Sequence, residues 1–170
     1  MVDNRQSLTE AVEAAEHGGR QPGGLAKNIL LSTAVFWSLF QLWVASPLPY
    51  TLGLGVFNDS ETRFIHLALA LFLAYLSFPW HRGRISHRIP TGDWLLALAA
   101  SSCALYLFLF YNELAARSGS PTTLDVAVAG AGVLLLLEAT RRALGWPLTI
   151  IASLFLVYTF AGPWLPDVMA

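Results

Sequence analysis

The apolar residues of the sequence gather into five long runs and do not recur at the period of an amphipathic helix or strand. Short segments rich in polar residues, glycine or proline separate the runs. The runs cover residues 25–45, 62–80, 93–111, 124–140 and 146–162. At about 1.5 Å per residue, a helix of roughly 20 apolar residues crosses the hydrocarbon core of a bilayer. The pattern therefore predicts an all-α fold, a polytopic membrane helical bundle of about five transmembrane helices.

Composition also favours a membrane protein. Of the 170 residues, 55% are hydrophobic and 12% are charged, which is about half the charged share of an average soluble domain. The formal net charge of −1 provides no basic surface for nucleic acid, so no nucleic-acid partner is expected. The single cysteine, Cys103, lies inside an apolar run and is interpreted as a small packing residue.

The runs divide the chain into three predicted parts. Residues 1–24 form a cytoplasmic segment and a Gly-rich linker, residues 25–144 a four-helix membrane domain, and residues 145–170 a fifth helix with its far-side end.

The basic residues predict the orientation, because the side of a membrane protein that is rich in Lys and Arg is normally cytoplasmic. Eight basic residues fall on one side of the predicted bundle, and two, Arg63 and Arg117, fall on the other. The larger set is Arg5, Arg20, Lys27, Arg82, Arg84, Arg88, Arg141 and Arg142. We therefore expect the N-terminus in the cytoplasm and the C-terminus on the far side.

Several polar residues lie at predicted helix starts. Asn58 and Glu61 are placed to cap the second helix. Asp93 and Asp125 fall in the first turns of the third and fourth helices, where a carboxylate interacts favourably with the helix dipole. Trp146 begins the fifth helix, at the depth where aromatic belts of membrane proteins lie.

Glu138 is the most informative charge in the sequence. It lies near the end of an otherwise apolar helix, and Arg141 and Arg142 follow it at the i+3 and i+4 positions. An unpaired carboxylate would be costly there, so a local ion pair is predicted to anchor the helix at the membrane interface. An anchor to a second subunit is the alternative.

His66 is the only histidine inside a predicted span, and Arg63 lies one turn before it. We interpret it as a hydrogen-bonding contact to a neighbouring helix, with a ligand or proton-relay role as the alternative. The other histidines, His17, His81 and His87, fall in predicted loops, so paired haem ligands are not recognised. With no recognisable nucleophile–base pair or metal-ligand cluster, neither enzymatic activity nor a cofactor is predicted.

Small residues at helical spacing predict close packing of the third helix against the fourth. The residues are Ala97, Ala100, Ser101 and Ala104 in the third helix, and Ala127, Gly130 and Ala131 in the fourth. Such residues let helix backbones approach closely. We therefore expect a tight antiparallel hairpin between these two helices.

A self-sufficient transporter is not predicted. Transporters contain interrupted helices, inverted repeats or ionisable groups near the middle of the membrane. Five runs cannot divide into two equal halves, and the third and fifth runs carry no charge between their ends. The helices are predicted to have a packing role.

Five stretches, in order, resemble the small-subunit region of tripartite ATP-independent periplasmic (TRAP) transporters, in the class whose soluble receptor is of the TAXI type. The stretches are residues 63–68, residues 89–90 with 93–96, residues 121–125, residues 134–145 and residues 162–166. The most specific element is the sequence Glu-Ala-Thr-Arg-Arg at residues 138–142. The resemblance covers the chain from about residue 25 to residue 166.

The resemblance implies a secondary uptake system of the bacterial inner membrane. A large transmembrane subunit would use a sodium or proton gradient to move an organic acid, delivered by a periplasmic TAXI-type receptor, in an elevator motion. The small subunit would brace this partner in the lipid bilayer without catalysis. Glu138, Arg141 and Arg142 would help to fix the helix that abuts the large subunit.

One departure from the family pattern is the number of spans. The simplest TRAP small subunits have four, so the fifth is interpreted as the connecting helix of a fused architecture. Two other hypotheses stay open: the small subunit of another tripartite carboxylate transporter, and a membrane redox or haem protein that uses His66.

Overall fold

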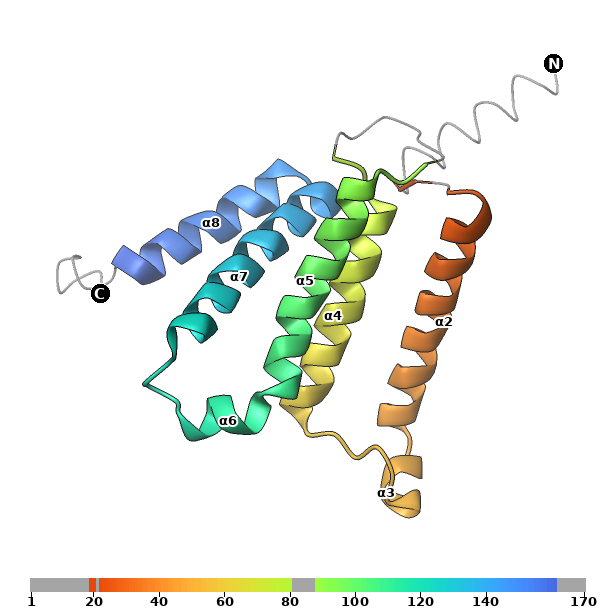
Figure 1. The fold of residues 1–170 in the computed structure, drawn as a ribbon, viewed down its shortest axis with the longest axis vertical. Helices are drawn as coiled ribbons and strands as arrows, with labels where there is room; N and C mark the ends of the chain where they lie inside the picture. The colour runs from red at the N-terminus through yellow and green to blue at the C-terminus, as the bar shows by residue number, and fades with distance from the viewer. Residues whose placement is uncertain (1–18, 21, 81–87, 162–170) are drawn as a thin grey trace.

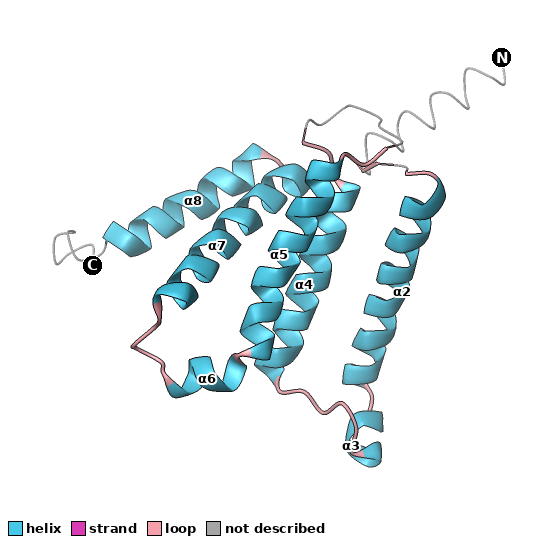
Figure 2. Cartoon of the chain, in the orientation of Figure 1, coloured by secondary structure: helices cyan, strands magenta, loops and turns pink. Residues whose placement is uncertain are grey.

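The computed structural model describes residues 19–20, 22–80 and 88–161, and within them it contains helices and loops but no strand. The elements are α2 (Gly24–Ala45), α3 (Leu48–Leu52), α4 (Asp59–Ser77), α5 (Thr91–Leu109), α6 (Tyr111–Ala116), α7 (Thr123–Leu144) and α8 (Trp146–Ala161). Consecutive long helices run in opposite directions (Figure 1), and short helices and loops connect them (Figure 2). The predicted all-α class is confirmed for the described residues. The predicted N-terminal segment up to residue 18, residue 21, residues 81–87 with Arg82 and Arg84, and the chain beyond residue 161 lie outside them.

Capping boxes begin two of the long helices. At α4, the Asn58 side chain accepts from the Glu61 backbone N–H at 2.8 Å, and the Asn58 N–H donates to the Glu61 carboxylate at 2.9 Å. At α7, Thr122 and Asp125 form the same pair of bonds at 3.3 and 2.8 Å. These bonds satisfy amide groups that a helix start leaves without intrahelical acceptors. The predicted cap at Asn58 and Glu61 is confirmed.

Three described helices are long and apolar enough to cross a membrane: α2, α5 and α7. The first turns of α4 carry Asp59, Glu61 and Arg63, and α8 has 16 described residues. The structure thus contains three candidate membrane-spanning helices, and the expected total of five stays a prediction.

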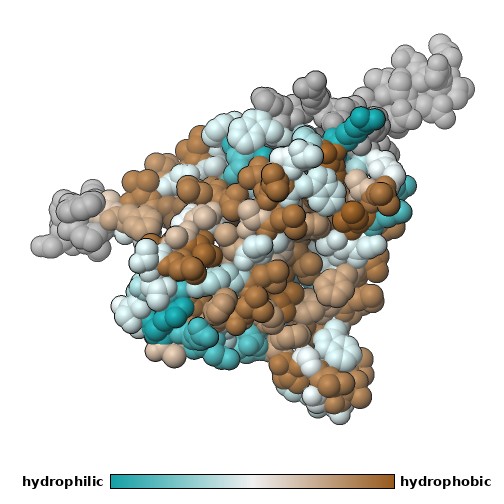
Figure 3. Space-filling view, in the orientation of Figure 1, coloured by the Kyte–Doolittle hydropathy of each residue, from teal (hydrophilic) through white to brown (hydrophobic). Residues whose placement is uncertain are grey.

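Apolar side chains cover much of the outside of the molecule (Figure 3). Leu25, Leu98 and Phe155, on three different helices, are 82%, 54% and 68% exposed. Soluble monomers rarely expose contiguous apolar patches larger than a few hundred Å². The exposed apolar surface and the long apolar helices identify a membrane-associated protein.

The core lies mainly between α4 and α5. Ala97 and Ala100 of α5 are fully buried, Ala104 is nearly so, and the Ser101 hydroxyl donates to the Ala68 carbonyl of α4 at 3.0 Å. Small side chains allow the two backbones to approach closely. The α5 stripe is therefore a packing surface, as predicted, but its main partner is α4 instead of α7.

The predicted packing of Ala127, Gly130 and Ala131 against α5 is wrong, because all three are exposed. α7 approaches α5 at Gly132, where an added Cβ would lie 3.5 Å from the Cβ of Cys103. Toward its N-terminus α7 leans away from α5, since α6 lies between the end of α5 and the start of α7 (Figure 1).

Candidate functional site

Five charged side chains meet at the end of the bundle where α2, α5 and α8 begin and where α4 and α7 end. We call them the ionic cluster: Arg20, Asp93, Glu138, Arg141 and Arg142. The antiparallel order of the helices brings these residues together, although 122 positions separate the first from the last along the chain.

Asp93 lies at the centre of the ionic cluster. Its Oδ1 accepts from Nη1 of Arg142 at 2.7 Å, and its Oδ2 accepts from Nη2 of Arg20. The side chains of Asp93, Arg20 and Arg142 are 8%, 3% and 1% exposed. Removing an ion from water costs several kcal/mol unless it is paired and hydrogen-bonded. Each carboxylate oxygen of Asp93 has its own arginine, which offsets that cost.

Glu138 binds both arginines that follow it. Nε and Nη2 of Arg141 each donate to the carboxylate at 2.7 Å, and Nε of Arg142 donates at 2.8 Å. The predicted local ion pair is confirmed. The helix continues to Leu144 instead of ending near residue 140, so both arginines lie inside it, where i+3 and i+4 side chains share a face with Glu138. Arg142 therefore bridges Glu138 in its own helix to Asp93 in α5.

Aromatic rings lie against the two guanidinium groups. The Cζ atom of Arg141 lies 4.7 Å from the ring centroid of Trp80 and 5.3 Å from that of Trp146. The Cζ atom of Arg142 lies 4.8 Å from the ring of Tyr75 and 5.2 Å from that of Trp80. An aromatic face attracts a cation, and more strongly when water is excluded. These contacts replace part of the hydration that the buried arginines lose.

Arg20 is the member of the ionic cluster that the sequence did not predict. It falls in the predicted Gly-rich linker, yet its backbone N–H donates to the Ser77 carbonyl at 2.7 Å, and its Nη1 lies 3.5 Å from the Leu76 carbonyl. The residue therefore joins the segment before α2 to the end of α4 and the start of α5.

The chemistry of the ionic cluster is that of a structural contact. All four carboxylate oxygens of Asp93 and Glu138 accept from arginine. Within the described residues, no group of three or more His, Cys, Asp or Glu side chains is placed to hold a metal ion. The arrangement fixes helix ends relative to one another.

No family model matches the sequence, and neither a curated protein nor a solved structure matches it.

His66 lies apart from the ionic cluster, between α4 and α2. The Trp37 indole N–H donates to its Nδ1 at 3.1 Å, and Nε2 of Gln41 lies 3.2 Å from the same atom. Because an indole nitrogen can only donate, Nδ1 must be the acceptor and the ring proton must lie on Nε2. These contacts connect α4 to α2, in which no residue is buried.

The remaining predicted residues lie near the opposite end of the bundle. Oδ1 of Asp125 accepts from the Tyr106 hydroxyl at 2.6 Å and from Nη2 of Arg117 at 2.9 Å, which joins α7 to α5 and to the turn after α6. Arg63 pairs with Asp59 at 2.8 Å, but these side chains are 76% and 80% exposed. An ion pair so exposed contributes at most about 1 kcal/mol.

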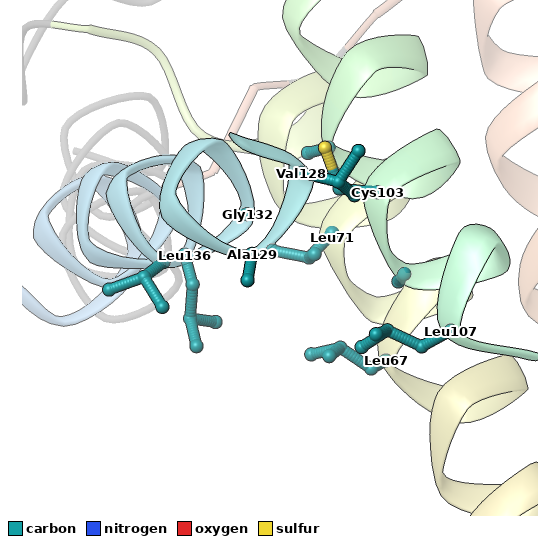
Figure 4. A pocket seen from close by; sticks show the side chains of 11 residues that line it. Leu67, Leu71, Cys103, Leu107, Val128, Ala129, Gly132 and Leu136 are labelled. Carbon is teal, nitrogen blue, oxygen red and sulfur yellow. The ribbon is translucent and has the colours of Figure 1, made fainter. Parts of the chain in front are cut away.

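An apolar hollow of about 180 Å³ lies between α4, α5 and α7 (Figure 4). Leu71, Cys103 and Leu136 are among its lining residues, and the Cys103 thiol is the one titratable group that lines it. Ligand sites combine an apolar wall with a few polar groups that orient the ligand. We interpret this hollow as a packing gap that forms where α7 leans away from α5.

Arg142→Lys is expected to lower the free energy of unfolding by about 2 kcal/mol. An ammonium group lacks the planar fork with which Arg142 reaches both Asp93 and Glu138. Unfolding of the purified chain in mixed micelles, followed by circular dichroism during titration with a denaturing detergent, measures the change. Arg63→Lys, at the exposed pair, is the matched control and is expected to change the free energy of unfolding by less than about 0.5 kcal/mol. Equal stabilities of the two variants would contradict the role of Arg142.

Proposed function

We propose that the chain is the non-catalytic small membrane subunit, or the equivalent region, of a TRAP-type secondary transporter. In this role it braces a large transport subunit in the bacterial inner membrane. The large subunit takes up an organic acid, delivered by a periplasmic TAXI-type receptor, at the expense of a sodium or proton gradient.

The ionic cluster carries this proposal. The residues 93–96 and 134–145 belong to two of the stretches that resemble the TRAP small subunit. Asp93 of the first stretch pairs with Arg142 of the second at 2.7 Å, across 49 positions of sequence. Residues from two stretches of the resemblance thus form one ion pair, which holds the start of α5 to the end of α7.

An ionic contact that holds helix ends together suits the stationary part of an elevator transporter. A moving transport domain exerts force on the helices that support it, and those helices must keep their relative positions. Separating α5 from α7 would leave Asp93 with Arg20 alone and Arg142 with Glu138 alone, and removing one partner of a buried ion pair typically costs about 3–5 kcal/mol. The cluster therefore resists separation of the helix ends.

The proposed topology has five spans, with the N-terminus in the cytoplasm. At 1.5 Å per residue, the 19 residues of α4 extend about 28 Å, close to the roughly 30 Å of a hydrocarbon core. The alternating helix directions leave the ionic cluster at one end of the bundle. Eight of the ten basic residues fall on the side of the predicted bundle that holds the ionic cluster, and this excess supports a cytoplasmic location for the cluster.

The topology can be tested with single cysteines in a Cys103→Ser background. Gly92→Cys and Ser120→Cys lie at exposed positions at opposite ends of the bundle. In spheroplasts, a membrane-impermeant maleimide is expected to label Ser120→Cys directly and Gly92→Cys only after permeabilisation. Labelling of both from outside, or the reverse order, would contradict the proposed orientation.

The function can be tested by purifying the tagged chain from its native membrane under mild conditions. We expect a large multi-spanning protein to copurify, and Glu138→Gln to reduce its recovery because the substitution weakens the ion pairs that position the end of α7. Glu113→Gln, an exposed carboxylate near the other end of the bundle, is the matched control and should leave recovery unchanged.

Two results would contradict the proposed function. One is a solitary chain that transports a solute by itself in liposomes. The other is a Soret band in the visible absorption spectrum of the purified chain, which would favour the haem-protein hypothesis with His66 as a ligand.

A further inference from the structure

Two neighbouring hollows of about 510 and 610 Å³ lie along the hairpin of α7 and α8 and have the lining residue Leu134 in common. Along α8 the lining residues recur every three or four positions from Trp146 to Phe160, and along α7 they do so from Val126 to Arg141. Residues at this spacing lie on one face of a helix. We call this surface the α7–α8 groove.

The two ends of the α7–α8 groove differ in polarity. The hollow of about 510 Å³ lies at the ionic cluster, and its lining includes Glu138 and Arg141 with Trp80 and Trp146 beside them. From Leu134 to the level of Asp125 the second hollow is mainly apolar, and its wall combines side chains of α7 and α8 with Tyr106, Leu107 and Leu114 of α5 and α6. A polar end with tryptophans beside a long apolar channel matches the division between the headgroup and hydrocarbon layers of a bilayer.

The ionic cluster, of which Glu138 and Arg141 line the polar end, carries one excess positive charge. Three arginines of the ionic cluster face two carboxylates. Nε and Nη2 of Arg141 bind Glu138, whereas among the described residues its Nη1 has only a long contact of 3.5 Å to the Trp80 carbonyl. The hydroxyls of Thr149 and Ser153 donate to carbonyls of their own chain segment at 3.1 and 2.8 Å. Arg141 is therefore the charged donor that this end of the groove offers to an anion.

We propose that the α7–α8 groove binds one anionic phospholipid from the leaflet on the Arg141 side. Its phosphate accepts hydrogen bonds from Arg141, and an acyl chain lies along Leu134 toward Phe160. The phosphate balances the excess charge of the ionic cluster, and phosphate oxygens suit the planar donors of a guanidinium. A transmembrane helix from a partner would fill the apolar channel but would not supply this charge. The proposal rests on the membrane association of the chain and does not depend on the proposed transport function.

The full chain, purified in detergent and stripped of lipid, is titrated with phosphatidylglycerol while its melting temperature and its lipid-bound mass are followed. One lipid should bind saturably and raise the melting temperature. Arg141→Gln should weaken binding by about tenfold or more, since a hydrogen bond to a charged group is lost. Diacylglycerol, which has no phosphate, and inorganic phosphate, which has no chain, should each bind much more weakly.

A second pair of variants leaves the ionic cluster intact. Leu134→Trp fills the middle of the groove at a residue that is 69% exposed, and it should abolish lipid binding. Leu95→Trp, at a residue of α5 that is 68% exposed, should not change it.

The site is overturned if the wild-type chain binds no lipid saturably, or if Leu134→Trp and Leu95→Trp bind it equally. Binding of diacylglycerol as tight as that of phosphatidylglycerol would remove the role of Arg141. A partner protein that copurifies with the wild-type chain in place of lipid, and is lost with Leu134→Trp, would show that the groove is a protein interface instead.

Discussion

The ion pair between Asp93 and Arg142 is the contact on which the arrangement of the helices depends. A carboxylate that is 8% exposed must be paired, and its two oxygens face in different directions. Arg142 at the end of α7 pairs with one oxygen and Arg20 in the segment before α2 pairs with the other, so two other parts of the chain must reach the start of α5. The aromatic rings of Tyr75 and Trp80 bring the end of α4 to the same place. A single buried charge thus determines how one end of the bundle is assembled.

The opposite end is assembled more loosely. α6 separates α5 from α7, and the contact of Asp125 with Tyr106 and Arg117 bridges the gap. Between the two ends, α7 leans outward and leaves apolar hollows on both of its sides. α2 is attached through the His66 contact and aromatic packing, without a buried residue of its own. A bundle fixed firmly at one end, with large apolar surfaces elsewhere, is suited to contact with lipid and with other membrane helices.

The sequence predicted the local features better than the tertiary ones. The long helices, the cap at Asn58 and the ion pair of Glu138 depend on residues within four positions of one another. Arg20 was missed because its partners lie 56 and 73 positions away and its glycine-rich surroundings suggest a linker. The helix that packs against the small residues of α5 was predicted wrongly, because the spacing of residues predicts which face of a helix is packed but not which helix packs against it. The short helix α6, which separates the start of α7 from the end of α5, was not predicted because its six residues are too few to form an apolar run of membrane-spanning length.

The strength of the Asp93–Arg142 contact can be measured most directly with a double-mutant cycle of Asp93→Asn and Arg142→Gln, by unfolding the purified chain in mixed micelles. Because the pair is buried, a coupling free energy of about 1.5–3 kcal/mol is predicted. The exposed Asp59–Arg63 pair, treated in the same way, provides the reference and should give less than about 0.5 kcal/mol. A coupling at Asp93–Arg142 no larger than this reference would contradict the view that this pair holds the helix ends together.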